Sequence, residues 1–226
     1  MKKRKIRLGL LFLIGLILFS PLSATAVPSL QLYIPGAEYD TITETWVFEG
    51  YSYELWAIGA DNKAYVTIKD IVLAAAIKEG EEGSLMISDS EGNDLSGKFF
   101  FNHTPVMSDG KSLSSHGIYP SDLFLFELGD FELEQQGIPD YGADYDPDNP
   151  VSTNNWGKTM IYRVNVTGYT WVHFDLYNHI EGENHALFAP FSHDAEDAPA
   201  VPEPATMLLM GLGLFGVAGM GRRMRK

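Results

Sequence analysis

Short runs in which apolar residues recur at every second position dominate the middle of this chain. Tyr53, Leu55 and Ala57 are separated by single residues, and so are Val66 and Ile68. Because successive side chains of a β-strand point to opposite faces, this spacing gives each run one apolar face. Runs of this length, bounded by glycine, proline and acidic clusters, predict strands.

The same pattern predicts about ten strands in all. The others are expected at 30–34, 43–47, 71–77, 84–87, 98–102, 123–128, 160–166 and 169–177. Only 71–79 could compete as a helix, and it has no helix caps. Short strands joined by turn-rich linkers favour an all-β fold, an antiparallel β-sandwich that is jelly-roll-like or immunoglobulin-like. Two irregular stretches, 108–121 and 135–157, interrupt the pattern.

The first 26 residues have the three parts of a cleaved secretory signal. A basic start is followed by the apolar run Leu8–Phe19 and then by Ala24 and Ala26 at a small-residue cleavage site. We therefore expect a signal helix over 1–26, transfer by the Sec translocon, and cleavage by signal peptidase before Val27.

The last 26 residues, 201–226, combine a proline-rich hinge, an apolar segment at 205–220 and a basic tail at 221–226. The apolar segment predicts a short transmembrane helix, but it falls short of the roughly 20 residues that span a bilayer. A transient anchor fits this length better than a permanent one. The basic tail would stay on the cytoplasmic side and leave the rest of the chain outside.

This tail resembles the PEP-CTERM sorting signal of Gram-negative envelope proteins, with Pro202, Glu203 and Pro204 as the motif. The resemblance implies recognition by an exosortase, which cuts near these residues. It also implies transient anchoring in the inner membrane, followed by delivery to the cell surface or the extracellular polysaccharide matrix.

Residues 27–200 are expected to form one extracytoplasmic domain. Over 27–203, seven basic residues face thirty acidic ones, a formal charge of −23. Nucleic acid is excluded as a partner because phosphate binding needs clustered cations. The chain has no cysteine, which removes thiol chemistry, disulfides and thiolate zinc sites. Its stability must come from the core or from ions.

The body is also similar to the choice-of-anchor N family, through the phrases at 30–34, 109–119, 128–131, 172–177 and 188–194. That resemblance implies a surface-anchored domain whose role is not established, and it assigns no catalytic residue.

Histidines in these phrases suggest a metal site. His173 and Asp175 share one face of a predicted strand, and His116 and His193 fall in the same set of phrases. Imidazole and carboxylate together suit zinc or another divalent ion. The commoner arrangement of such a pair is a hydrogen-bonded pair on a solvated strand face.

A second, weaker metal candidate lies in the irregular stretch 135–157. Asp144, Asp146 and Asp148 form a fragment of a calcium loop, but Asn149 and Asn155 replace its turn glycine and closing glutamate. A solvated acidic loop is the better interpretation.

We expect no enzyme and no cofactor other than a possible divalent cation. Ser192, His193 and Asp194 are contiguous, whereas a hydrolytic triad gathers distant residues around an oxyanion hole. Trp156, in a polar stretch, could stack on a sugar or fold back over the sandwich edge. The leading prediction is a structural, adhesive or binding role toward matrix polysaccharide or surface proteins. A metal-dependent binding module and a secreted hydrolase are the alternatives.

Overall fold

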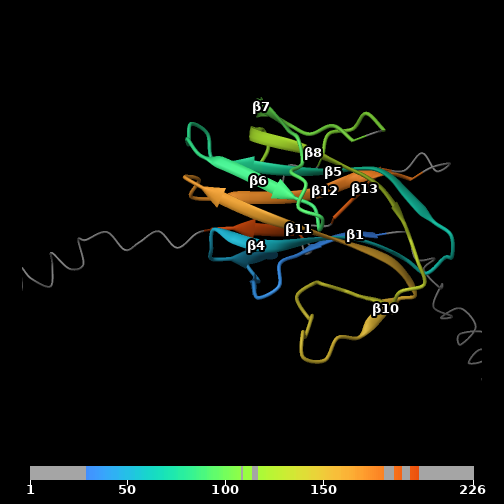
Figure 1. Cartoon of the computed structure of the whole chain (residues 1–226). Coiled ribbons are helices and arrows are strands. Elements are labelled where there is room, and N and C mark those ends of the chain that lie inside the picture. Colours follow the sequence, from blue (N-terminus) through green and yellow to red (C-terminus); the bar gives the residue numbers. More distant parts are fainter. Residues whose placement is uncertain (1–28, 108, 114–116, 181–185, 190–193, 199–226) are drawn as a thin grey trace, which may run out of the picture.

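Two stacked β-sheets form the body of the protein (Figure 1). The computed structural model describes residues 29–107, 109–113, 117–180, 186–189 and 194–198. The smaller sheet has the strand order β1 (Ser29–Tyr33), β4 (Ser52–Asp61), β11 (Trp156–Thr167) and β6 (Ser84–Ser88). No helix occurs among the described residues, so the predicted all-β sandwich is confirmed there.

The larger sheet contributes the strands that carry the candidate site. Its order is β2 (Glu38–Asp40), β3 (Thr45–Phe48), β14 (Asp194–Asp197), β12 (Val172–Ile180), β5 (Thr67–Ile77), β8 (Ser121–Glu132) and β7 (Gly97–His103). In addition, β13 (Ala186–Phe188) pairs with β12. Among the described strands every pairing is antiparallel except that of β14 with β3, which is parallel. A small ribbon, β9 (Ile138–Pro139) with β10 (Ser152–Asn154), stands apart from both sheets.

Strand β5 joins two segments that the sequence pattern predicts separately, 66–69 and 71–77. The alternation breaks because Asp70 has a left-handed φ of 52° and the register with β8 shifts beside it. Ile68 and Ile71 are consequently both buried although three positions separate them. The Asp70 N–H donates to the Asp130 side chain on β8, which holds this bulge in place.

The main core lies between the two sheets. Leu32, Leu55 and Val164 from the smaller sheet face Leu73 and Phe174 from the larger one, and all five are fully buried. These positions follow the period-two alternation of their strands, which explains why the sequence predicts them well.

The segment between β7 and β8 packs on the outer face of the larger sheet, where the candidate site lies, and the polar residues at the centre of that site are buried. Met107, Leu113 and Tyr119, from the segment between β7 and β8, pack against a second buried cluster that includes Ala74 and Tyr177. The described residues of the predicted irregular stretch 108–121 therefore contribute to a layer over the sheet. A strand face that would otherwise meet water becomes interior.

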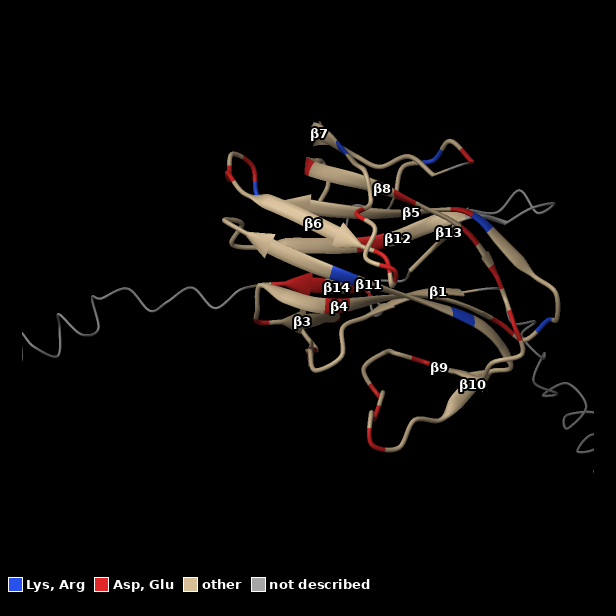
Figure 2. Ribbon diagram, in the orientation of Figure 1, with Lys and Arg blue, Asp and Glu red and all other residues tan. Residues whose placement is uncertain are grey.

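The acidic segment between β9 and β10 folds over the outer face of the smaller sheet (Figures 1 and 2). The Gln31 side chain accepts a hydrogen bond from the Tyr141 N–H at 2.8 Å. The rings of Tyr141 and Tyr145 lie 4.8 and 5.2 Å from that of Tyr33. Aromatic packing therefore anchors a segment whose tip is acidic.

Short strands account for most differences from the sequence-based prediction. The strands β2, β9, β10, β13 and β14 are two to four residues long, too short to show a period. Strand β12 begins at Val172, whereas the prediction began it at Tyr169. The helices predicted over 1–26 and 205–220 lie outside the described residues. Within the described part, no helix has the length and apolarity to cross a membrane.

Candidate functional site: a buried histidine and carboxylate group

Strand alternation along β12 separates two kinds of side chain. Phe174 and Leu176 enter the main core, whereas His173 and Asp175 point to the opposite face, as the sequence predicts. That face is not solvated: His173 and Asp175 are each only 1% exposed. The expectation of a solvated surface pair is therefore wrong, because the segment between β7 and β8 covers this part of the sheet.

Strand β14 brings two further carboxylates to the same place. It pairs with β12 so that Glu196 lies opposite His173. Since side chains two positions apart share a face, Asp194 and Glu196 both lie on the face of His173. Asp194 is fully buried and Glu196 is mostly buried.

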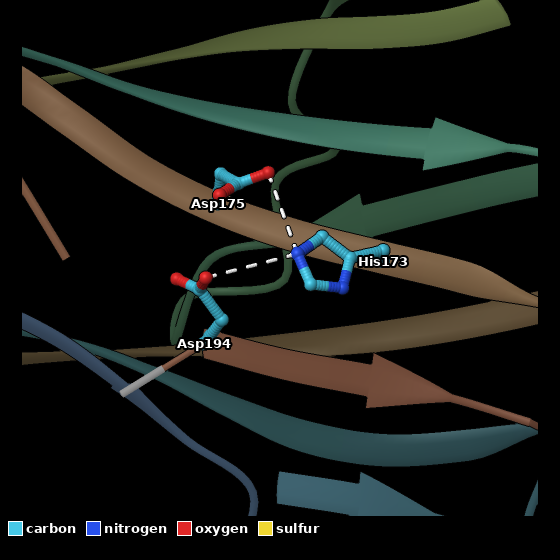
Figure 3. Close-up of side chains that lie close together, drawn as sticks. All are labelled: His173, Asp175 and Asp194. Atoms are coloured by element: carbon cyan, nitrogen blue, oxygen red, sulfur yellow. Dashed lines mark ion pairs between the residues drawn. The ribbon is translucent and has the colours of Figure 1, made fainter. Parts of the chain in front are cut away.

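The ligand-type atoms of three of these residues converge (Figure 3). His173 Nε2 lies 3.5 Å from Asp175 Oδ2 and 3.8 Å from Asp194 Oδ2. One such atom from each residue lies within 4.8 Å of the others, and no other group of histidine, aspartate and glutamate in the described part of the chain meets this condition. We call His173, Asp175 and Asp194 the central group.

Two neighbours fix the orientation of the central group. His173 Nδ1 lies 2.8 Å from Glu196 Oε1. Because a carboxylate accepts hydrogen bonds, this contact places a ring proton on Nδ1 and aims Nε2 at the two aspartates. On the other side, the Tyr119 hydroxyl donates to Asp175 Oδ2 at 2.5 Å.

The pKa values of the group reflect several carboxylates packed around one imidazole at a buried position. Burial would lower the pKa of His173, but Asp175, Glu196 and Asp194 outweigh it and raise that pKa to about 10. Burial, reinforced by the charge of Asp175, raises the pKa of Asp194 well above its ordinary value. Burial and the same charge also raise the pKa of Tyr119. Positive charge, from protons or from a cation, is therefore strongly favoured here.

The predicted metal ligands are only partly accounted for. His173 and Asp175 come together, whereas His116 and His193 lie outside the described residues. Sequence reasoning missed Asp194, Glu196 and Tyr119 as members of the site. The available signal was the alternation Asp194-Ala195-Glu196, which repeats the His173-Phe174-Asp175 spacing of β12.

The weaker candidate, Asp144, Asp146 and Asp148, lies on an exposed loop. Asp146 Oδ1 accepts a hydrogen bond from the Asp148 N–H at 3.0 Å, a local turn contact. Asp144 and Asp146 line an open pocket of about 520 Å³. Their carboxylates do not form a converging group of the kind at His173. The calcium hypothesis for this loop stays a prediction.

Trp156 is the first residue of β11, and its half-buried ring packs against the main core. Trp156 therefore begins a strand, whereas the sequence places it in a polar stretch between predicted strands. Its ring is 5.5 Å from that of Tyr65, which is 91% exposed. The Trp156 ring is anchored against the core and the Tyr65 ring is exposed beside it. Stacking on a ligand stays a prediction, and Tyr65 joins Trp156 as a candidate residue for it.

Trp171 connects the central group to the molecular surface. Its ring stacks on His173, with centroids 5.7 Å apart and an interplanar angle of 23°. The same side chain lines an open pocket of about 370 Å³ together with Ile118 and Asp122. The fluorescence of Trp171 can therefore report a change in the protonation or ligation of His173.

Comparison with known families identifies the carboxyl-terminal segment. The profile of the PEP-CTERM protein-sorting motif matches residues 200–226, so the chain carries this motif. The motif implies an exported protein that is anchored, sorted and processed by an exosortase. No curated protein matches the chain. The resemblance of the body to choice-of-anchor N proteins stays a prediction.

Solved structures resemble the chain only distantly. An enzyme described as catalysing macrocyclization in alchivemycin A biosynthesis, AvmM, is 10% identical, with 80% of this chain and 92% of that one covered and a TM-score of 0.33. A CBM3a-L domain of the Clostridium thermocellum scaffoldin is 8% identical, with 62% and 68% covered and a TM-score of 0.27. The collagen-binding subdomain of the Enterococcus faecalis surface protein ACE is 10% identical, with 77% and 97% covered and a TM-score of 0.25. Likeness at this level assigns no function to the chain.

Proposed function

We propose that this protein is a non-catalytic β-sandwich module that an exosortase delivers to the cell surface or polysaccharide matrix of a Gram-negative bacterium. Export through the Sec translocon and removal of 1–26 by signal peptidase precede that delivery. The PEP-CTERM match supports the route. The role at the destination is structural, adhesive or binding.

The burial of the central group supports a non-catalytic role. This converging group of titratable side chains is closed to solvent, because His173 and Asp175 are 1% exposed and Asp194 is 0% exposed. A general base or nucleophile must come within hydrogen-bond reach of its substrate. This group meets other protein side chains instead, which suits support of the fold.

The secreted hydrolase is correspondingly disfavoured. Asp194, which belongs to the contiguous Ser192-His193-Asp194 stretch, directs its carboxylate toward His173 on the neighbouring strand. This arrangement supports a role for Asp194 in the buried group. The metal-dependent binding module is the better alternative, and the converging geometry of the central group favours it.

The aromatic pair Tyr65 and Trp156 is the proposed contact surface. An exposed ring beside an anchored one can stack on the apolar face of a sugar, and tyrosine and tryptophan also supply hydrogen-bond donors. Lys63 and Asn62 precede Tyr65 in an exposed turn and can bind the hydroxyl or acidic groups of a polysaccharide. Matrix polysaccharide is therefore the proposed partner.

The test is binding of the exported protein, purified in mild detergent with its carboxyl-terminal segment retained, to polysaccharide isolated from the matrix of the producing bacterium. Tyr65→Ala is expected to weaken binding about tenfold, since truncating an aromatic anchor typically costs more than 1 kcal/mol. Ile42→Ala is the matched control because Ile42 is also 91% exposed. Equal loss in both variants, or no binding by the native chain, would rule out this surface as a sugar site.

A further inference from the structure

We infer that His173, Asp175 and Asp194 bind one divalent transition ion, with Zn²⁺ as the best representative, and that this ion fastens β14 to β12. The inference is independent of the proposed partner at Tyr65. It concerns what holds the outer layer of the domain together.

The spacing of the donor atoms supports a shared ion. Zinc binds imidazole nitrogen and carboxylate oxygen at about 2.0–2.2 Å, so two ligands of a tetrahedral site lie roughly 3.4 Å apart. The distances from His173 Nε2 to the nearest oxygens of Asp175 and Asp194 are 3.5 and 3.8 Å. Direct hydrogen bonds would be shorter, about 2.7–2.9 Å for charged partners. The separations between the imidazole nitrogen and the two carboxylates are therefore those of ligands around one shared ion.

The charges of the group also favour a bound divalent ion. Three carboxylates, those of Asp175, Asp194 and Glu196, surround one imidazole ring on a covered strand face. Buried carboxylates are costly unless positive charge compensates them, and among the described residues His173 contributes a single positive charge to this group. A divalent ion in place of the Nε2 proton neutralises both aspartates of the central group.

The neighbours of the central group have the arrangement that orients metal ligands. A metal-binding histidine usually donates its other ring N–H to a carboxylate, which fixes the tautomer. Glu196 occupies that position on His173 Nδ1 at 2.8 Å. The Tyr119 hydroxyl holds Asp175 in the same way.

The donor set also selects the kind of ion. Calcium takes six to eight oxygen ligands, whereas the central group offers one nitrogen and a few carboxylate oxygens. Imidazole with carboxylate suits zinc and similar transition ions. Zinc with three protein ligands keeps a fourth position for water or a further donor.

An ion at this position would tie together elements that are distant in sequence. Asp194 opens β14, which is four residues long and pairs in parallel with β3. Tyr119 ends the segment that covers the outer face. The ion would join β14, the last strand that the structure describes, directly to β12, and it would hold the Tyr119 segment indirectly through the hydrogen bond from Tyr119 to Asp175.

The direct test is metal binding by the exported protein, purified in mild detergent with its carboxyl-terminal segment retained and dialysed against EDTA. We expect one zinc per chain on reloading, and a rise in Tm of roughly 5–10 °C at zinc about 100-fold above its Kd. Co²⁺ should quench tryptophan fluorescence through Trp171, which stacks on His173. Trp171→Phe should lose that quenching while keeping the bound metal.

Substitutions then locate the site. Asp194→Asn and His173→Gln remove ligands with little change in volume, and each is expected to weaken zinc binding at least 100-fold. Glu196→Gln should weaken it about 10- to 100-fold through the orientation of the ring. Asp61→Asn, at an equally buried aspartate outside the group, should bind zinc like the native chain.

Two outcomes would overturn the inference. One is a native chain that takes up no stoichiometric zinc, manganese or cobalt and gains no thermal stability from any of them. The other is unchanged metal binding in folded Asp194→Asn and His173→Gln, which would place the ion elsewhere. Circular dichroism of each variant establishes that it is folded before the comparison is made.

Discussion

The sequence suggests metal binding in two regions that contain aspartates, and the structure shows that these regions differ in burial. The loop with Asp144, Asp146 and Asp148 carries three carboxylates in five residues, all exposed. The central group draws Asp175 and Asp194 from strands that are adjacent in the sheet but separate in the chain, and both are buried.

The difference shows that local charge density is a poor guide to a site. Neighbouring acids on a loop repel each other and reach water, so each is solvated independently. Acids brought together beneath a covering segment must share protons, hydrogen bonds or a cation. A buried group of acids therefore limits which protons or cations can occupy the site. Such a group forms only when the fold brings distant residues together.

Loss of His173 is expected to have the largest effect on stability. His173→Ala removes the imidazole that contacts three carboxylates in the described part of the chain, so it should destabilise the chain by about 3–5 kcal/mol. Urea unfolding of the full chain in EDTA measures this value. A loss below about 1 kcal/mol would indicate that water already solvates the group and that the contrast with the loop is false.

A smaller effect is expected from the hydroxyl that contacts Asp175. Tyr119→Phe removes the donor but keeps the ring, so it should cost about 1–3 kcal/mol. Tyr51→Phe is the control, because the Tyr51 side chain is exposed. Equal unfolding free energies for the two variants would contradict a buried hydrogen bond at Asp175.

The opposite face of β14 provides a pH test. Burial raises the pKa of Asp197 to about 7, and the nearby Gly50 backbone and Tyr53 hydroxyl only partly oppose this rise. The folded state therefore holds this proton more tightly than the unfolded state. The resulting stability is present below about pH 4 and is lost as the pH rises through 7.

Asp197→Asn should remove this dependence. The variant is expected to match the native chain near pH 4 and to exceed its stability at pH 8 by about 1–3 kcal/mol. Thermal unfolding between pH 4 and 8 gives both values. A variant with the same pH profile as the native chain would mean that Asp197 reaches solvent.

Neutralising the acidic loop should have the smallest effect. Replacement of Asp144, Asp146 and Asp148 by asparagine should change the unfolding free energy by no more than about 0.5–1 kcal/mol, because these side chains are exposed. Zinc stoichiometry should not change. A large loss of stability that calcium prevents in the native chain would instead revive the calcium hypothesis for this loop.

The sequence was informative where a strand is long enough to show its period. The alternation of β12 predicts that His173 and Asp175 share a face, and the structure agrees. Their burial was not predictable, because the covering segment before β8 has no periodic pattern. Its apolar contacts, Met107 and Leu113, are separated by five polar or glycine residues, 108–112, so no period-two alternation joins them.

Strand β14 shows the other limit. Its sequence, Asp-Ala-Glu-Asp, consists of residues that are depleted in strands. Its partners β3 and β12 compensate for that composition by placing it inside the larger sheet. A parallel pairing across some 150 residues leaves no local signal, so Asp194 and Glu196 could be assigned to the site only from the fold.

The most direct test of the central group is a crystal structure with anomalous diffraction measured at the zinc absorption edge. A single anomalous peak is expected about 2.0–2.2 Å from His173 Nε2 and from one oxygen each of Asp175 and Asp194. His173 Nδ1 should remain on Glu196. Zinc-soaked crystals with no peak at this position, and with His173 Nε2 bonded directly to a carboxylate, would contradict the account.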